Sequence, residues 1–291
     1  MSRVASSSAS DSAPAELPPS RQESLELRCP DGLPLRVLRH LPARCAQEAA
    51  RASLPLVVIC HGFKGFADWG FFPHLADALS GPGREVLRFD YSHNGVASHD
   101  PEVFSRLDLF ERQSLTRHVA DLGLLLDELA GSRPVWLVGH SMGGGVAVMR
   151  AADDARVAGL ATLNGISHAQ RMPPEALAQF AALGRVEIPN ARTGQIMPLG
   201  RAWFDDVDAI TLSDDARRVT QPALVLQGAS DTTVLPEEGR RLAQWLGNAR
   251  LCEIPEGDHT FGAKHPWLGW TKPLRRALAE LQAFLPREER A

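Results

Sequence analysis

The chain has 291 residues, of which 44% are hydrophobic and 23% charged, and its formal net charge at pH 7 is −4. This length suits one large α/β domain with an insertion, and the spread of Lys and Arg without a basic block argues against nucleic acid or an anionic membrane surface as the main partner. No apolar run reaches the roughly 18 residues of a membrane span. We therefore expect the substrate to be a small, roughly neutral molecule.

The N-terminal segment and the cysteines bear on localisation. Residues 1–22 are rich in Ser, Ala and Pro and lack an apolar core, so we predict a disordered tail rather than a secretory signal. The cysteines form neither a C-x-x-C pair nor a ligand cluster with His, and we interpret them as reduced, mostly buried thiols. They are Cys29, Cys45, Cys60 and Cys252. A cytoplasmic protein is expected, with its folded domain at residues 23–288.

Predicted strands and helices alternate along most of that domain. An antiparallel hairpin comes first, because residues 24–29 and 35–41 flank the turn signal Pro30-Asp31-Gly32. The continuous apolar run at 54–60 is typical of a strand buried on both faces of a mostly parallel sheet. Further strands are predicted at 84–90, 135–138, 157–164, 222–227 and 249–254. Helices are predicted at 72–79, 107–129, 143–149, 237–246 and 272–284.

The alternation fails between residues 167 and 219. This stretch holds a helix-like piece at 174–183, a segment punctuated by Pro, Asn and Gly at 186–200, and an acidic, aromatic segment at 201–210. We expect an insertion over the carboxyl edge of the sheet that acts as a small cap. Strand–helix alternation on both sides of it is typical of a doubly wound, mostly parallel sheet with right-handed crossovers, and therefore of an α/β fold.

The stretch 135–149, VWLVGHSMGGGVAVM, passes from an apolar strand into a small-residue helix, and Ser141 lies at the turn. So sharp a turn requires strained dihedrals at the serine, and glycine at 139 and 143 because side chains there would collide with neighbouring backbone. The Met142 amide then lies at a helix N-terminus, where it stabilises negative charge. The pattern G-x-S-x-G alone is only moderately specific, since a glycine-rich turn can carry an incidental serine.

A serine hydroxyl becomes a nucleophile only beside a base that a carboxylate orients. Asp231 and His259 each follow a predicted strand, and the carboxyl ends of parallel strands are where such groups gather. Asp258 is an alternative acid, although neighbours in sequence point apart, and His265 is an alternative base. Asp90 also follows a strand and is interpreted as a carboxylate that fixes a loop.

These motifs resemble the α/β-hydrolase superfamily, in the order Ser, Asp, His and with the loop His-Gly-Phe after the strand at 54–60. The resemblance covers about residues 24–286 and is to the single-domain esterase and dienelactone-hydrolase-like branch. Dienelactone hydrolases have a cysteine nucleophile, so Ser141 points instead to ordinary carboxylic esters. The resemblance implies that the Phe63 amide is the second oxyanion donor beside the amide of Met142.

Several other side chains near these motifs have either a structural or a functional interpretation. His61 is interpreted as a structural histidine of the oxyanion loop rather than as a base, since His259 already fits that role, and it is also a candidate for the substrate pocket. His140 is expected to pack beside the helix. Aromatic residues after the loop and in the insertion either line the pocket or belong to the core. They are Trp69, Phe71, Phe72, Trp203 and Phe204.

The sequence thus predicts a serine hydrolase of small or medium carboxylic esters that uses the triad Ser141, His259 and Asp231 and needs no cofactor or metal. The same triad serves acyltransferases, thioesterases and peptidases, and the residues do not discriminate among them. A non-catalytic binding protein of the same fold is the alternative from a different class. Oligomeric state is not indicated.

Overall fold

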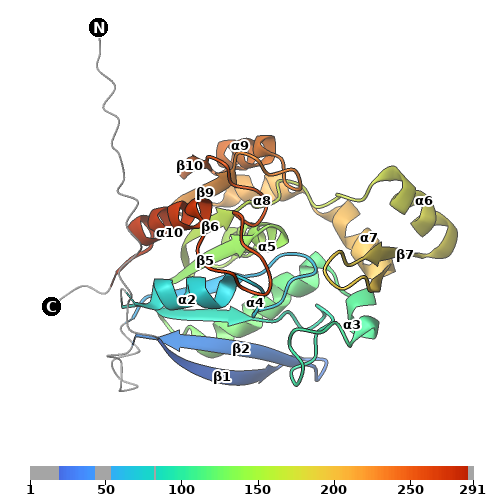
Figure 1. Ribbon diagram of the computed structural model, residues 1–291, viewed down its shortest axis with the longest axis horizontal. Coiled ribbons are helices and arrows are strands. Elements are labelled where there is room, and N and C mark those ends of the chain that lie inside the picture. Colours follow the sequence, from blue (N-terminus) through green and yellow to red (C-terminus); the bar gives the residue numbers. More distant parts are fainter. Residues whose placement is uncertain (1–19, 43–53, 82, 288–291) are drawn as a thin grey trace, which may run out of the picture.

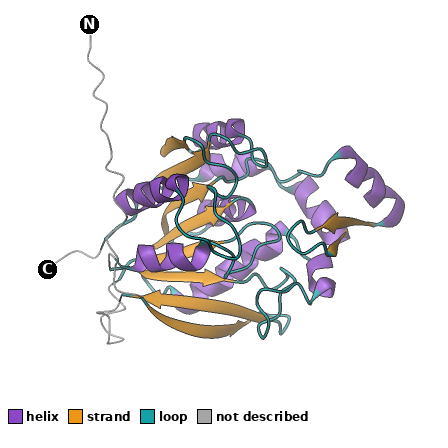
Figure 2. Cartoon of the chain, in the orientation of Figure 1, coloured by secondary structure: helices purple, strands orange, loops and turns teal. Residues whose placement is uncertain are grey.

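The computed structural model describes residues 20–42, 54–81 and 83–287 (Figure 1). The predicted tail at 1–22 lies outside these ranges apart from its last three residues, and Arg21 and Gln22 already belong to β1 (Arg21–Arg28). Within the described part of the chain, an 8-stranded sheet has the order β1-β2-β4-β3-β5-β6-β9-β10. Helices cover both faces of this sheet (Figure 2).

The antiparallel part of the sheet lies at one edge. β1 pairs antiparallel with β2 (Pro34–Leu41), and β2 pairs antiparallel with β4 (Glu85–Phe89). The remaining strands pair in parallel, which confirms the hairpin and the mostly parallel sheet. They are β3 (Leu56–Cys60), β5 (Val135–His140), β6 (Val157–Leu163), β9 (Ala223–Gly228) and β10 (Ala249–Ile254).

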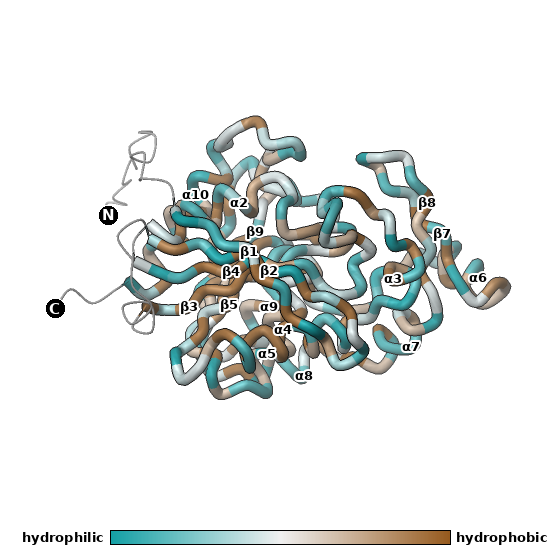
Figure 3. The backbone as a smooth tube through the Cα atoms, turned by 90° about the horizontal axis from the view of Figure 1, so that it is seen from below, coloured by the Kyte–Doolittle hydropathy of each residue, from teal (hydrophilic) through white to brown (hydrophobic). Residues whose placement is uncertain are grey.

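The central strands are buried on both faces, as the apolar run in β3 predicts. Leu56 and Val58 belong to one hydrophobic core, while Val57 and Ile59 belong to the other, because successive side chains of a strand point to opposite faces. Figure 3 shows this hydrophobic band along the central strands. One core is covered by α2 (Phe72–Ser80) and α10 (Lys272–Phe284). The other is covered by α4 (Leu115–Leu129), α5 (Met142–Asp153) and α9 (Pro236–Trp245).

The prediction of one continuous helix over residues 107–129 is wrong. The structure has a short α3 (Leu107–Glu111), then a break, then α4. Ser114 is extended, with φ −155° and ψ 161°, and its side chain accepts a hydrogen bond from the Arg117 amide at 3.2 Å. A serine in this position caps a new helix rather than continuing the old one, so the leucine spacing on either side hides the break.

The insertion contains α6 (Pro174–Leu183), β7 (Arg185–Pro189), β8 (Ile196–Gly200), α7 (Arg201–Ala209) and α8 (Leu212–Arg218). The helix predicted at 174–183 is confirmed, whereas the Pro-, Asn- and Gly-punctuated segment forms the antiparallel hairpin β7–β8, which the sequence did not reveal. α6, the hairpin and α7 project from one side of the sheet (Figure 1). In the residues described, no helix has both the length and the apolar character needed to cross a bilayer.

Candidate active site

Ser141 lies on a strained turn between β5 and α5. Its φ of 54° falls in the left-handed region, which a non-glycine residue adopts only when its surroundings enforce it. A Cβ atom on Gly139 would lie 2.2 Å from the Gly143 carbonyl oxygen, and one on Gly143 would lie 2.3 Å from that of Cys60. The close packing expected of the two glycines is therefore present, and it fixes the backbone on both sides of the serine.

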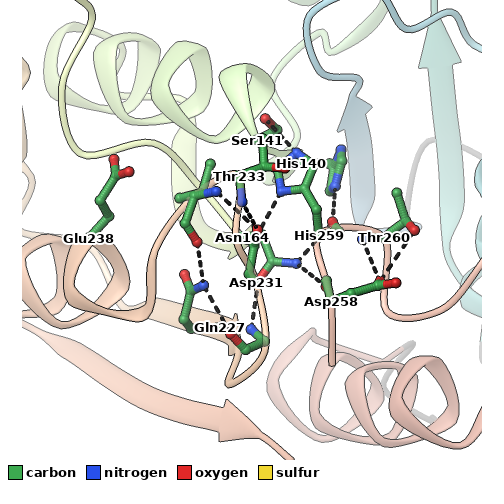
Figure 4. A network of polar contacts seen from close by, with 12 residues as sticks. His140, Ser141, Asn164, Gln227, Asp231, Thr233, Glu238, Asp258, His259 and Thr260 are labelled. Carbon is green, nitrogen blue, oxygen red and sulfur yellow. Dashed lines mark hydrogen bonds and ion pairs between the residues drawn. The ribbon is translucent and has the colours of Figure 1, made fainter. Parts of the chain in front are cut away.

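The structure brings Ser141, His259 and Asp231 together (Figure 4). The Nε2 atom of His259 is 3.1 Å from Ser141 Oγ, and its Nδ1 atom is 2.8 Å from Asp231 Oδ2. Because an ionised carboxylate only accepts hydrogen bonds, Nδ1 carries the proton and Nε2 is left to accept from the serine hydroxyl. The three side chains thus stand in the arrangement that a nucleophile, a base and an orienting acid require.

Asp231 is held by the loop that follows β9. The residue is 2% exposed, and Oδ1 accepts hydrogen bonds from the backbone amides of Thr233 at 2.8 Å and Val234 at 2.9 Å. Oδ2 remains for His259. These bonds fix the plane of the carboxylate, so the acid cannot turn away from the imidazole.

Asp258 and His265, the alternative acid and base, have other partners. Oδ1 of Asp258 accepts from the amides of Thr260 at 3.0 Å and Gly262 at 2.6 Å, so this carboxylate shapes the loop around His259. Nδ1 of His265 accepts from the Gly70 amide at 3.0 Å. Both residues therefore serve the backbone rather than the serine.

The loop after β3 passes directly beside Ser141. A Cβ atom on Gly62 would lie 3.0 Å from the Cβ of Ser141, so a larger residue here would press on the serine. Phe63 is the next residue, and Met142 begins α5, where its N–H group has no acceptor within the helix. The two predicted oxyanion donors thus lie on the segments that flank the serine.

His61 and Asp90 shape that loop from within. His61 is 2% exposed, with Nδ1 2.9 Å from the Gly62 carbonyl and Nε2 3.5 Å from the Asn94 amide. Burial lowers the pKa of His61, so its ring stays neutral. These contacts favour the structural role over the pocket role. Asp90 accepts from the Ala67 amide at 2.7 Å, which agrees with a carboxylate that fixes a loop.

The predicted pocket aromatics separate into two groups. Phe72 is 2% exposed and belongs to the core beneath α2, and Trp69 packs edge-on to Phe71 with ring centroids 5.9 Å apart. Trp203, from α7 of the insertion, packs on the Phe63 ring with centroids 5.0 Å apart. Of the predicted pocket residues Trp69, Phe72 and Trp203, it is Trp203 that joins the insertion to the oxyanion loop.

Asn164 and Glu238 are buried polar residues of the site that the sequence did not reveal. Asn164, after β6, bonds the loops that carry Asp231 and His259. Glu238, on α9, is 3% exposed and accepts hydrogen bonds from the Ser167 amide at 3.1 Å and from Arg171 at 2.6 Å. Asn164 follows a strand, and Glu238 lies in the first turn of a helix. These positions predict a buried role only weakly, because most polar residues at such places face water.

Comparison with known proteins places this geometry in context. A sequence model described as the alpha/beta hydrolase family matches residues 57–288. A mouse protein named sn-1-specific diacylglycerol lipase ABHD11 is 34% identical over 267 residues, which cover 79% of this chain and 83% of that protein. Human monoglyceride lipase is 27% identical over 187 residues, which cover 60% of this chain and 58% of that protein.

A solved structure of Est1E from Butyrivibrio proteoclasticus with ferulic acid bound has the same fold. Its TM-score is 0.69 at 20% sequence identity, and the match covers 89% of this chain and 97% of that one. The matches to the mouse protein and to Est1E thus cover most of this chain. They do not single out the dienelactone-hydrolase-like branch.

Proposed function

Because the chain belongs to the α/β hydrolase family, we propose that it is a serine hydrolase that cleaves small or medium carboxylic esters through an acyl-enzyme intermediate. The observation that carries this proposal is the hydrogen-bonded chain from Ser141 Oγ through His259 to the buried Asp231. A complete chain of this kind favours an enzyme over a non-catalytic binding protein of the same fold.

In the first half of the reaction, Ser141 Oγ attacks the ester carbonyl carbon while Nε2 of His259 takes the hydroxyl proton. Asp231 stabilises the resulting imidazolium. The carbonyl oxygen becomes an oxyanion, which accepts hydrogen bonds from the amides of Phe63 and Met142, and each such donor lowers the barrier by about 3–4 kcal/mol. When the intermediate collapses, His259 gives its proton to the departing alkoxide, and the acyl group stays on Ser141.

The second half repeats these steps with water. His259 takes a proton from a water molecule as the water oxygen attacks the acyl carbon, and the second tetrahedral intermediate releases Ser141 Oγ. The proton on His259 returns to the serine oxygen. The carboxylic acid leaves, and the enzyme is restored without a metal or an organic cofactor taking part in any step.

The insertion at 167–219 is proposed to act as a cap that shapes the acyl or alcohol pocket and excludes water. Supporting this, Trp203 packs on Phe63, and Lys64 Nζ donates to the Pro189 carbonyl of β7 at 3.2 Å. The substrate class is proposed by analogy with the lipases and the ferulic acid complex named above. The rings of Trp203 and Phe63 are apolar, and either an acyl chain or an aromatic acid would pack well against such rings.

Labelling with a fluorophosphonate probe, followed by mass spectrometry, tests the proposal. We expect an adduct on Ser141 of the wild type and a much slower reaction in His259→Ala. Ser141→Ala should lose turnover of an activated ester by about 10⁴-fold or more. Ser230→Ala is the matched control, since this exposed serine lies directly before Asp231. Turnover that survives Ser141→Ala would refute the assignment.

A further inference from the structure

The backbone carbonyl of His259 accepts hydrogen bonds from two buried side chains. Asn164 Nδ2 is 3.0 Å from this oxygen, and His140 Nε2 is 2.8 Å from it (Figure 4). Asn164 is fully buried, and His140 is 6% exposed. Neither side chain touches the serine hydroxyl or the Asp231 carboxylate, so the triad itself does not account for them.

Asn164 links the loop of the acid to the loop of the base. Its Oδ1 atom accepts from the Gly228 amide at 2.6 Å, at the end of the strand that leads to Asp231. Its Nδ2 atom donates to the carbonyls of Asp258 and His259, both at 3.0 Å. One rigid amide group therefore sets the distance between the two loops, and both of its ends are used.

His140 links the nucleophile to the base. It directly precedes Ser141, and its Nε2 atom must carry the proton, because the carbonyl that it faces only accepts. The pKa of His140 is lowered to about 3, mainly by burial and to a smaller extent by the charge of His259. The ring therefore remains a neutral donor over the whole range in which a catalytic histidine works.

The His140 ring has little freedom to leave this position. Phe71 and Phe72 meet it edge-on, with ring centroids 5.6 Å and 5.9 Å away, and the His259 ring lies 4.9 Å away. The donor is consequently fixed by packing as well as by its hydrogen bond.

From this arrangement we infer that Asn164 and His140 are positioning residues that hold the His259 backbone so that its imidazole can transfer protons in both halves of the reaction. The inference rests on the proposed function. The hydrogen bond to Asp231 fixes one ring atom, but the ring can still swing about that bond unless its backbone is also fixed. A displacement of about 1 Å at a reacting group costs about 100-fold in rate, so support of this kind acts on turnover rather than on substrate binding.

Two near-isosteric variants test the inference. Asn164→Asp keeps an acceptor for the Gly228 amide but places a carboxylate oxygen where the donor was, and His140→Phe keeps the aromatic packing but has no donor. With p-nitrophenyl butyrate as substrate, each should lower kcat by about 10–100-fold and change KM by less than about twofold. Rates are divided by the concentration of sites titrated with fluorophosphonate, so that unfolded protein does not count.

Thr260→Val is the matched control. Thr260 follows His259, and its hydroxyl lies 2.8 Å from the Ala263 carbonyl and 3.3 Å from Asp258 Oδ1, so the variant loses these hydrogen-bond partners in the same loop without touching the His259 carbonyl. We expect kcat to stay within about twofold of the wild type. An equal fall of kcat in Thr260→Val would overturn the inference, because general loosening of the loop would then explain all three variants.

Wild-type kcat in folded His140→Phe and Asn164→Asp, with an active wild type, would also overturn it. If Asn164→Asp does not fold, His140→Phe decides alone. Failure of the proposed function looks different: the wild type would then form no adduct on Ser141, or Ser141→Ala would keep its turnover.

Discussion

The serine side and the insertion side of the candidate site are held in place by different means. Around Ser141, backbone packs on backbone so closely that an added Cβ on Gly143 would lie 2.3 Å from the Cys60 carbonyl oxygen. The insertion contacts the rest of the domain through side chains, such as Trp203 on Phe63 and Arg171 on Glu238, and also through backbone at Gly200, where an added Cβ would lie 2.7 Å from the Glu111 carbonyl oxygen. Within the described helix α6 (Pro174–Leu183), no residue is buried.

This difference suits the two tasks of the proposed ester hydrolase. The groups that exchange protons need fixed positions, which a packed backbone provides. If substrate enters on the insertion side, as proposed, that side needs to adapt, and α6, which has no buried residue, can open at a low free-energy cost. Substitutions on the serine side should therefore have large effects on folding and turnover, while those on the insertion side should have smaller effects on local opening and binding.

The largest effect is expected for Gly143→Ala. The added methyl group would meet the backbone of β3, which cannot move without disturbing the central sheet. We expect the free energy of unfolding to fall by about 3 kcal/mol or more and turnover to be lost. Urea unfolding and ester hydrolysis measure the two effects.

Gly247→Ala is the control for this variant. A Cβ on Gly247 would have no heavy atom within 4 Å among the described residues, and the φ angle of Gly247 is not left-handed. The free energy of unfolding should change by less than about 0.5 kcal/mol. Normal stability and turnover in Gly143→Ala would show that the turn at Ser141 can relax, and the contrast between the two sides would then fail.

The features of the serine side were the ones that the sequence could predict. Apolar runs and glycine spacing are local signals, so the strands and the turn at Ser141 follow from short stretches of chain. The sites of Asp231 and His259 follow as well, because each residue lies in the loop that follows a parallel strand. The helix break at Ser114 was missed because leucine spacing continues on both sides of the cap.

The insertion and the supporting polar groups could not be predicted in the same way. In the hairpin β7–β8, Pro189 and Pro198 interrupt the alternation that marks a strand, although Val186 and Leu199 pair across it. Asn164 finds its partners 94 and 95 residues away, and such contacts leave no trace in a local pattern.

A moderate effect, dependent on pH, is expected where Glu238 anchors the insertion. Burial alone would raise the pKa of this carboxyl, but hydrogen bonds from His168 and Arg171 lower it to about 2, against an ordinary 4.5. The lowered pKa means that the ionised form stabilises the fold above pH 4.5 and that this stability is lost as the pH falls toward 2. The contribution of the ionised carboxylate to stability amounts to at most about 3 kcal/mol.

Glu238→Gln should therefore increase hydrogen exchange in residues 167–172 at pH 7, and the difference from the wild type should shrink near pH 3. Hydrogen exchange followed by mass spectrometry at both values measures it. A difference that is the same at both values would mean that the charge of Glu238 does not hold the insertion.

Asp121, on α4, is a second buried carboxylate, outside the insertion, and accepts hydrogen bonds from Ser92. Burial raises the pKa of Asp121 to about 6, so its ionisation opposes folding, and stability should fall as the pH rises from 3.8 to 6. Asp121→Asn should reduce this loss of stability with rising pH. The pH dependence has the opposite sign to that at Glu238, where stability is lost as the pH falls. Urea unfolding at pH 4 and pH 7 compares the two carboxylates directly.

The smallest effect is expected for Lys64→Met, which removes the hydrogen bond from Nζ to the Pro189 carbonyl, 3.2 Å long and exposed. This bond joins the loop after β3 to β7, and an exposed bond of this kind contributes about 1 kcal/mol or less. We expect KM for an activated ester to change about two- to threefold with kcat unaltered. Arg185→Met is the control, because Arg185 pairs with Glu187 inside the hairpin at 3.6 Å.

The position of Lys64 makes this variant a sensitive test of the contrast, since Lys64 directly follows the proposed oxyanion donor Phe63. If kcat falls tenfold or more, the tether to β7 sets the conformation of the oxyanion loop, and the two sides form one unit. If only KM changes, the contacts of Gly62 and His61 fix the conformation of the oxyanion loop without the insertion. The insertion then affects only how substrate enters. The second result is expected, because the His61 bond to the Gly62 carbonyl is buried and Asp90 holds the Ala67 amide independently of the hairpin.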